Sequence, residues 1–561
     1  METRRLVYTL TGIGVALIAI LGGLSIILLA TGGGSDESSS RSPGANGDEN
    51  GSPTPNLPER VEGELRLFGG DPITLDPACA SDADSAAYIV EIFSGLVSFD
   101  KDLNVIPDIA ETIDVSPDGL VYTFHLRGNV EFHDASRRVV AGDFKFSMER
   151  AVNPDTQSTV GEVYLDDIAG VDEFIAGSAE EVSGIKAIND NTLEITIKEP
   201  IVYFLDKLTY PTGYVVDQRE VADSTCFEGA DWTLNPNGTG PFKMKEFVLG
   251  ERIELEANTR FYLDPKPSLQ QVTYLLAGGS SLVMYENDEI DISGVGVNDV
   301  ERIRDPNEPL NAEYRTGANM STDYIGFNTE EPPFDDPEIR RAFAMATDRD
   351  LISETVLMDI LLPAKGVLPP GIDGYDETFA GVPFDPEAAR AIIDEAGGAD
   401  LFRDVTLLTS GQGAAPSEAL AAVTALWEEN LGVSIAIEQE EFGIFLRDID
   451  QGNFSMFSLG WIADYPDPQN FLEIKLHSQS ADNETKYSNP DVDELLDKAK
   501  TEKDEAERVR LYQQAEKLII EDSPWVPLFH GQDSVLIKPY VKNFINAPFV
   551  IPRMRYVSIE R

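Results

Sequence analysis

Cysteine and histidine are scarce in this sequence of 561 residues, which contains two cysteines and four histidines. The histidines are His125, His133, His477 and His530. Because they are mostly far apart in the chain, we expect satisfied structural side chains rather than a metal centre. The cysteines, Cys79 and Cys226, leave two alternatives open. They either form one disulfide, which a compartment outside the cytoplasm permits, or remain two buried thiols.

Positive charge is also in short supply: Lys and Arg number 43 against 99 Asp and Glu, and the formal net charge is −56. Such a surface excludes nucleic acid as a partner, because phosphate binding requires clustered cations. A calcium-rich protein would carry repeated D-x-D-x-D-G loops, whereas the acids here are spread along the chain. We therefore interpret the acidity as a solvated surface suited to a salty medium that screens its self-repulsion.

Catalytic signatures are missing as well. The sequence has no G-x-S-x-G and no H-E-x-x-H, and its few histidines offer no evident triad. Paired carboxylates can perform glycoside hydrolysis, but acids are so abundant here that pairs arise by chance. An extracellular hydrolase is therefore the unfavoured alternative, and we expect a protein without enzymatic activity and without a cofactor.

Charge is absent from residues 6–30, which follow two arginines. As a helix at about 1.5 Å per residue, this segment would extend ~37 Å, enough to cross a bilayer. The arginines place residues 1–5 in the cytoplasm and the rest of the chain outside. The stretch LLATGGGSDESSS resembles a bacterial lipoprotein signal, but Thr31 occupies the position of the lipidated cysteine. We predict an uncleaved anchor, with cleavage after Ala30 as the alternative.

Residues 31–60 are rich in Gly, Ser, Pro, Asn and acids, and predict a disordered tether. Hydrophobic residues make up 42% of the chain, and its length predicts about three domains. Period-two alternation predicts strands in LVYTFHLR and TLEITIKE, and a hairpin with its tip at Gly250. Entry signals of Asp and Pro predict helices in DDPEIRRAFAMATDRDLISETVL and DPEAARAIIDEAGG. The fold class is therefore α/β with mixed sheets.

An ordered series of motifs runs through the folded part. It comprises LRLFGGDPITLDP, IFSGLVSFDKDLNVIPDIAE, VYTFHLR, DFKFSMERA, GTGPFKMKEF, FNTEEPPFDDPEIRRAFAMATDRD, WIADYPDPQNF, YSNPDVDELLDKA and EDSPWVPLF. In this order the motifs resemble the extracellular solute-binding proteins of peptide-type ABC transporters, the oligopeptide, dipeptide and nickel group called solute-binding family 5. The resemblance implies a three-lobed periplasmic-binding-protein-like fold of the cluster C type, in which two main lobes close on a ligand cleft.

The resemblance also implies how the chain divides and where it works. Domain I would combine residues 61–105, 201–314 and 526–561, domain II would be an insertion at 106–200, and domain III would comprise 315–525. Taken together with the anchor predicted at residues 6–30, this would be a membrane-anchored monomer on the outer face of the cytoplasmic membrane, in the periplasm or at the cell surface. There it would capture a peptide or similar small solute and deliver it to the permease subunits of an ABC importer.

The stretch GWIADYPDPQNF carries the candidate ligand site. In peptide-binding members an aspartate in this stretch holds the α-ammonium of the ligand, and the matching residue is Asp464. The backbone around Gly460, Trp461 and Ile462 matches a strand that pairs with an extended peptide, and Trp461 and Tyr465 would wall the acid from water. The residues alone favour a structural interpretation, in which Asp464 caps a turn beside core aromatics. The resemblance favours the interpretation of Asp464 as part of a ligand site over the structural one.

One departure from the family pattern concerns the type of ligand. Some oligopeptide binders carry an arginine six residues before the aspartate, where it receives a ligand carboxylate. Here that position is Ser458. A short peptide clamped by its C-terminus is therefore disfavoured, and the ligand is of another length or another kind. A binder of oligosaccharide or nickel chelate in the same fold stays the alternative.

Overall fold

The structure is a computed structural model that describes residues 59–221, 224–411 and 415–561. The predicted anchor at 6–30 and nearly all of the predicted tether at 31–60 lie outside the described residues. Within those described ranges, no helix is both long enough and apolar enough to cross a bilayer.

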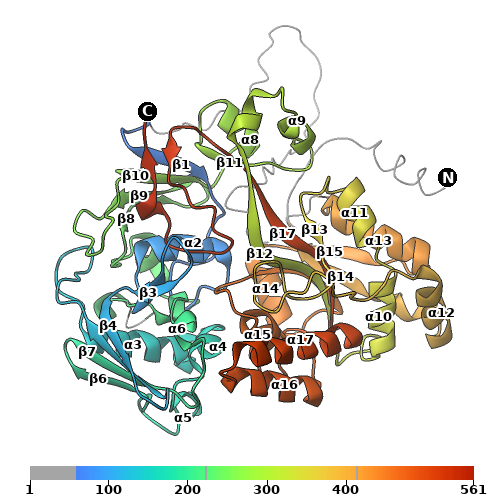
Figure 1. Cartoon of the computed structure of the whole chain (residues 1–561), viewed down its shortest axis with the longest axis horizontal. Coiled ribbons are helices and arrows are strands. Elements are labelled where there is room, and N and C mark those ends of the chain that lie inside the picture. The colour runs from blue at the N-terminus through green and yellow to red at the C-terminus, as the bar shows by residue number, and fades with distance from the viewer. Residues whose placement is uncertain (1–58, 222–223, 412–414) are drawn as a thin grey trace, which may run out of the picture.

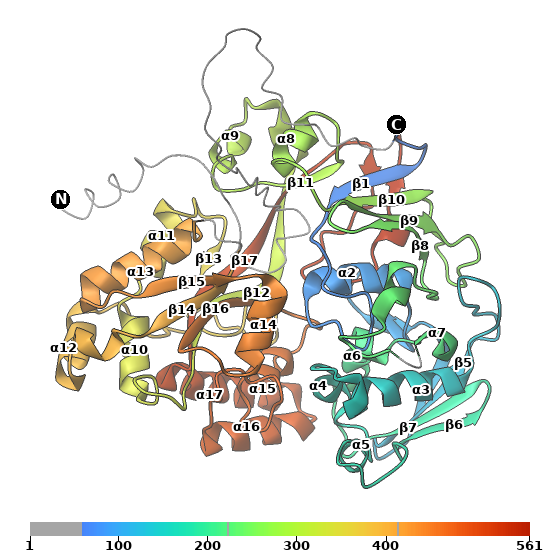
Figure 2. The ribbon, with the colours of Figure 1, turned by 180° about the vertical axis from the view of Figure 1, so that it is seen from behind.

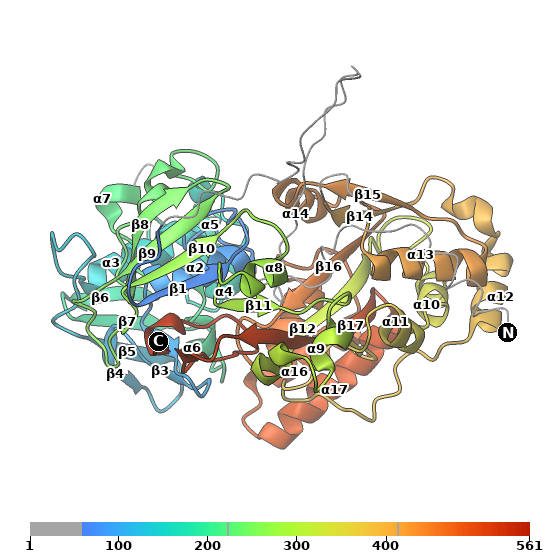
Figure 3. The same ribbon diagram turned by 90° about the horizontal axis from the view of Figure 1, so that it is seen from above.

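Two long strands, β12 (Tyr314–Phe327) and β17 (Trp525–Ile537), connect two lobes that lie side by side (Figures 1 and 3). Both belong to an eleven-stranded mixed sheet of order β15-β14-β16-β12-β17-β11-β1-β10-β9-β8, in which β13 also pairs with β17. The first lobe contains β1 (Glu64–Phe68), β8 (Phe242–Val248), β9 (Arg252–Ala257), β10 (Gln271–Leu275) and β11 (Ile292–Gly294). The second contains β13 (Leu362–Pro363), β14 (Thr406–Ser410), β15 (Ala436–Glu440) and β16 (Met456–Ile462).

A separate four-stranded antiparallel sheet of order β4-β5-β7-β6 lies at the far end of the first lobe (Figure 2). Its strands are β4 (Ala110–Val115), β5 (Val121–Leu126), β6 (Ile185–Asn189) and β7 (Thr192–Thr196). The alternation predicted for β5 is present, since Tyr122, Phe124 and Leu126 are buried while the residues between them are half-buried. These side chains share one apolar core with Phe144 and Met148 of helix α3 (Ala141–Val152).

Helices pack on both sides of the sheet in the second lobe. They are α10 (Pro337–Met345), α11 (Arg349–Thr355), α12 (Pro386–Ala396), α13 (Glu418–Leu431), α14 (Phe442–Asp450), α15 (Gln469–Leu476), α16 (Pro490–Thr501) and α17 (Glu505–Asp522). The entry signals act as expected: the side chain of Asp385 accepts the amide of Ala388, and a proline follows at the first helical position. Gly397, at φ 133°, then ends α12.

The stretch predicted as helical from Asp335 to Leu357 contains two helices instead of one. Helix α10 ends at Met345, and the side chain of Asp348 accepts the amide of Leu351 to begin α11. An aspartate that caps a new helix removes its own residue from helical geometry, so the chain changes direction there. The sequence pattern contained this cap, but the stretch holds several other acids, of which Asp336 caps α10.

A disulfide joins Cys79 to Cys226 in the first lobe and closes a loop with a sequence separation of 147. Of the two alternatives left open by the sequence, the structure has the disulfide. Cross-linking residues so far apart removes much conformational freedom from the unfolded chain.

We expect the double variant Cys79→Ser/Cys226→Ser to lose about 3–5 kcal/mol of unfolding free energy, because its unfolded state regains that freedom. Urea unfolding of the variant and of the oxidised wild type, each monitored by tryptophan fluorescence, measures the difference. The reduced wild type is the matched control and should unfold like the variant. Equal midpoints for oxidised and variant protein would contradict the expectation.

Candidate functional site

Strand β16 has one edge that is paired only in part. It pairs with β12 along its whole length, from Met456 to Ile462. On its other side β14 pairs only with Met456 and Phe457. From Ser458 to Ile462 this edge therefore has no partner strand among the residues that the structure describes. An edge of this kind presents backbone groups to which another extended chain can add.

The direction of the backbone groups follows from one hydrogen bond. The amide of Ala463 donates to the carbonyl oxygen of Met320 at 2.8 Å, and so points toward β12. In an antiparallel ladder alternate residues point to alternate sides. Trp461 therefore bonds toward β12, whereas the amide and carbonyl groups of Gly460 and Ile462 point to the open edge. These are the backbone positions that the sequence analysis singled out.

Asp464 lies just beyond the end of this strand and is held by two donors. The hydroxyl of Tyr164 donates to Oδ2 at 2.5 Å, and Nδ2 of Asn470 donates to the same oxygen at 2.9 Å. The amide of Asp464 in turn donates to Oδ1 of Asn470 at 3.0 Å. Burial raises the pKa of Asp464 to about 6, although the two donated hydrogen bonds oppose that rise. The acid is thus positioned while no basic side chain pairs with it in the described structure.

The aromatic residues beside Asp464 have different surroundings. Trp461 is half-buried, donates from Nε1 to Oδ1 of Asn470 at 3.2 Å, and has Nζ of Lys475 4.2 Å from its ring centroid. Tyr465 is fully buried and donates its hydroxyl to Gln469 at 2.6 Å. Tyr465 therefore supports the turn after the strand from within the core, whereas Trp461 retains an exposed surface. Pro468 then forms the N-cap of helix α15.

Tyr164 was not found by sequence reasoning, since it lies 300 residues from Asp464 in a short helix, α4 (Gly161–Leu165), with no distinguishing motif. Its ring stacks on that of Tyr210 with centroids 3.6 Å apart. Tyr210 donates to the carbonyl oxygen of Ala80 at 2.7 Å. This chain of contacts connects the acid of the second lobe to the body of the first.

A second connection between the lobes is ionic. Nζ of Lys500, on α16, is 2.8 Å from a carboxylate oxygen of Asp167, which also receives Lys207 at 2.6 Å. Burial acts to raise the pKa of Asp167, but the two ammonium groups outweigh it and hold that pKa below its usual range. Nearby, Tyr203 donates to Glu473 at 3.2 Å. Helices α4 and α16 face each other at this junction (Figure 2).

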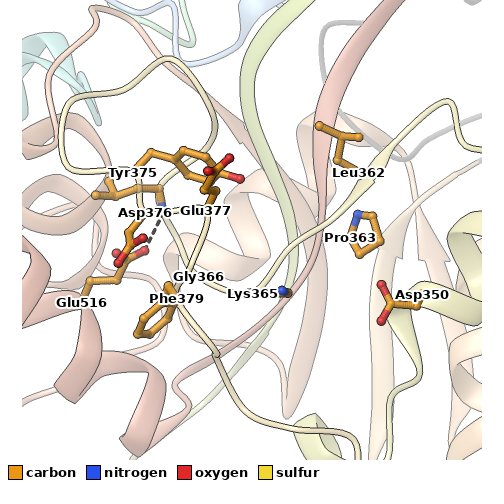
Figure 4. A pocket seen from close by; sticks show the side chains of 11 residues that line it. Asp350, Leu362, Pro363, Lys365, Gly366, Tyr375, Asp376, Glu377, Phe379 and Glu516 are labelled. Atoms are coloured by element: carbon orange, nitrogen blue, oxygen red, sulfur yellow. Dashed lines mark hydrogen bonds between the residues drawn. The ribbon is translucent and has the colours of Figure 1, made fainter.

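A pocket of about 240 Å³ lies elsewhere in the second lobe (Figure 4). It is lined by Asp350, Leu362, Pro363, Lys365, Gly366, Leu368, Tyr375, Asp376, Glu377, Phe379 and Glu516. Glu516 accepts the amides of Val367 and Leu368 at 2.8 and 2.9 Å, so its carboxylate holds the loop that forms one wall. None of the site residues predicted from the sequence lines this pocket. The described residues also contain no group of three or more His, Cys, Asp or Glu that could hold a metal ion.

Comparison with known proteins identifies related chains. A family model described as Bacterial extracellular solute-binding proteins, family 5 Middle, matches residues 104–483. The periplasmic oligopeptide-binding protein OppA of Escherichia coli K12 is 32% identical over 493 residues, which cover 86% of this chain and 89% of OppA. The probable deoxycholate-binding periplasmic protein YgiS of the same strain is 30% identical over 489 residues, which cover 84% of this chain and 89% of YgiS.

Solved structures add information on the arrangement of the lobes. The murein tripeptide binding protein MppA of Escherichia coli matches with a TM-score of 0.79 and 28% identity, over 89% of this chain and 98% of MppA. MppA in its unliganded open form covers the same shares at 27% identity but gives a TM-score of 0.64. The fold is thus α/β and periplasmic-binding-protein-like, and it superposes less well on that open form.

We expect the variant Lys500→Met to loosen the junction between the lobes, because Asp167 then keeps only the cation of its own lobe. Small-angle X-ray scattering of the ligand-free protein should show a larger radius of gyration than for the wild type. Lys498→Met is the matched control, since Lys498 lies on the same helix, is exposed and pairs only with Glu494 among the described residues. Identical scattering from both variants would show that the ion pair does not hold the lobes together.

We expect Asp464→Asn to stabilise the ligand-free protein at neutral pH. Because the pKa of this carboxyl is raised to about 6 in the fold, its contribution to stability is present at low pH and is lost as the pH rises through about 6. The difference in melting temperature between variant and wild type should therefore grow from pH 4.5 to pH 7.5. A difference that is constant over this range would contradict the burial argument.

Proposed function

The chain belongs to the bacterial extracellular solute-binding proteins of family 5, and we propose that it captures a peptide-like ligand outside the cytoplasm and delivers it to an ABC importer. The observation that carries this proposal is the open edge of β16, which ends beside the positioned carboxylate of Asp464. OppA, at 32% identity, is named as an oligopeptide-binding protein and provides independent support.

The geometry of the site suits the backbone and the terminal ammonium of a free peptide. An extended backbone can add to the amide and carbonyl groups of Gly460 and Ile462 as a further strand. Its terminal ammonium can then approach Asp464, whose carboxylate would accept a charge-assisted hydrogen bond. Such a bond gains strength where Trp461 and its neighbours exclude water. Binding of this kind involves no covalent step, and we propose that the protein is not an enzyme.

We propose that the ligand is enclosed between domain I (61–105, 201–314 and 526–561) and domain III (315–525), with domain II (106–200) against one side. The four-stranded sheet falls wholly within the proposed domain II, which supports that boundary. The lower TM-score against the open form of MppA supports a lobe arrangement that changes on binding. Closure would bring Tyr164 onto Asp464.

We further propose that residues 6–30 tether the monomeric protein to the outer face of the cytoplasmic membrane, on the basis of their uncharged sequence. Because OppA and YgiS are both described as periplasmic, a location outside the cytoplasm agrees with this topology. The linker at 31–60 would then give the binding lobes freedom to reach the permease.

A thermal-shift screen of the purified protein tests the function. We expect free tri- to pentapeptides to raise the melting temperature, since a ligand at 100 times its dissociation constant stabilises a protein by ~2.7 kcal/mol. The same peptides with an acetylated N-terminus should have little effect, because they carry no ammonium for Asp464. Oligosaccharides, nickel chelates and deoxycholate form the remaining arms of the screen.

Two variants sharpen the result. Asp464→Ala should lose peptide binding by orders of magnitude, because the ligand ammonium is left unpaired. Asp491→Asn, an exposed acid on α16, is the control and should bind like the wild type. A response to sugars, metal or bile acid with none to peptides would overturn the assignment to peptides while leaving the family intact.

A further inference from the structure

A second carboxylate lies one strand away from the open edge. Asp323 is on β12 directly opposite Gly460 in the pairing with β16. Residues that are opposite each other in a sheet point to the same face, and side chains alternate along each strand. Asp323 therefore shares a face with Gly460, and also with Asn319 and Ser321 of its own strand. All of these lie on the face opposite to that of Trp461.

Asp323 is buried without a partner. The residue is 2% exposed, and no described residue donates a hydrogen bond to Oδ1. No ion pair to either of its oxygens occurs in the described structure, and burial alone raises its pKa to about 7. Oδ1 of Asn319, further along the same face, also lacks a donor. Two buried acceptors without donors create a local demand for hydrogen-bond donors, above all for a cation.

This situation differs from that of other buried acids in the chain. Asp76 is fully buried but receives both guanidinium nitrogens of Arg150, at 2.9 and 2.6 Å. Asp291 is likewise buried and receives Arg60 at 2.8 Å. These two buried acids are paired with arginine from within the chain, and the buried Glu91 and Glu516 each accept two backbone amides instead. Asp323 has no such partner among the described residues, and this absence suggests that a ligand supplies one.

Gly460 is the residue of β16 that lies between the open edge and Asp323, and it has no side chain. A ligand residue that pairs with Gly460 would project its side chain onto the face that carries Asp323. The two backbones would be two strand spacings apart, about 10 Å, and at this position β16 places no side chain between them on that face. A long ligand side chain that lies across Gly460 could reach the carboxylate of Asp323, so that the two side chains together span this distance. Lysine and arginine are the long side chains that donate to a carboxylate.

We propose that Asp323 is a second cation receptor, which selects lysine or arginine at the ligand residue paired with Gly460. The proposal rests on the proposed function, since it requires a peptide along β16. The preferred ligand then carries two positive charges, its terminal ammonium on Asp464 and a side-chain cation on Asp323. The net charge of −56 favours the approach of such ligands over long distances.

Isothermal titration calorimetry of the full-length protein tests the proposal at pH 7.5. The probes are tetra-alanine peptides in which lysine, or its uncharged counterpart norleucine, replaces each residue in turn. We expect the wild type to bind one lysine peptide at least tenfold more tightly than the norleucine peptide of the same position. Asp323→Asn should remove that preference and bind the norleucine series as the wild type does.

A second variant tests the path. Gly460→Val keeps the acid but fills the space above it, so the lysine preference should also disappear in this variant. Melting curves without ligand show whether each variant folds, and Asp323→Asn should melt no lower than the wild type because it removes an unpaired buried charge. Acetylation of the peptide N-terminus removes the ammonium that would bind Asp464. It should therefore weaken the binding of lysine and norleucine peptides alike to the wild type and to both variants.

The outcomes are distinguishable. Equal affinity for lysine and norleucine at every position in the wild type would overturn the second receptor and leave peptide binding in place. A lysine preference that survives in Asp323→Asn would overturn the role of this residue. Failure of every peptide in both series would instead overturn the proposed function, and the inference with it.

Discussion

The antiparallel pairing of β12 with β17 is the constraint on which the rest of the structure depends. These two strands continue from one lobe into the other, so they fix where β16 lies, and the proposed closure of the lobes would have to take place about them. Their register shifts between Ala318 and Thr322, and within this interval Met320 donates its amide to the carbonyl oxygen of Pro548, outside the sheet. The hydrogen bonds between β12 and β17 are interrupted near the junction of the two lobes. Bending the sheet at this point would therefore break fewer hydrogen bonds than bending it elsewhere.

The candidate site contains a carboxylate whose charge does not stabilise the folded protein. An ionised carboxylate without a cation destabilises the fold that contains it, whereas one paired with arginine, as in Asp76, does not incur that cost. Asp464 has only the neutral donors Tyr164 and Asn470. A cationic ligand would supply the missing charge, so part of the free energy of binding would come from relieving an unfavourable feature of the empty site.

Local patterns in the sequence predicted much of the secondary structure, because strand alternation, proline entry and glycine exit act within a few residues. The ordered motifs led to Asp464 and to the backbone of Gly460 and Ile462. Contacts between distant segments were not predictable in this way, and Tyr164 is the clearest case. Asp323 did leave a signal that was overlooked: an acid within NMSTDYIGF, a run that is otherwise free of charge and reads as buried strand.

Some oligopeptide binders carry arginine where this chain has Ser458, and the position of Asp323 offers a physical reason for the difference. Ser458 and Gly460 alternate onto the face of the sheet that carries this acid, and Ser458 is opposite Ile325, two residues along β12 from Asp323. An arginine at 458 would lie within reach of Asp323 and could neutralise it from within the chain. With serine there, the acid stays unpaired and a ligand carboxylate would be repelled. If Asp323 receives a ligand cation as proposed, serine at this position would favour a cation where the arginine of some oligopeptide binders receives an anion.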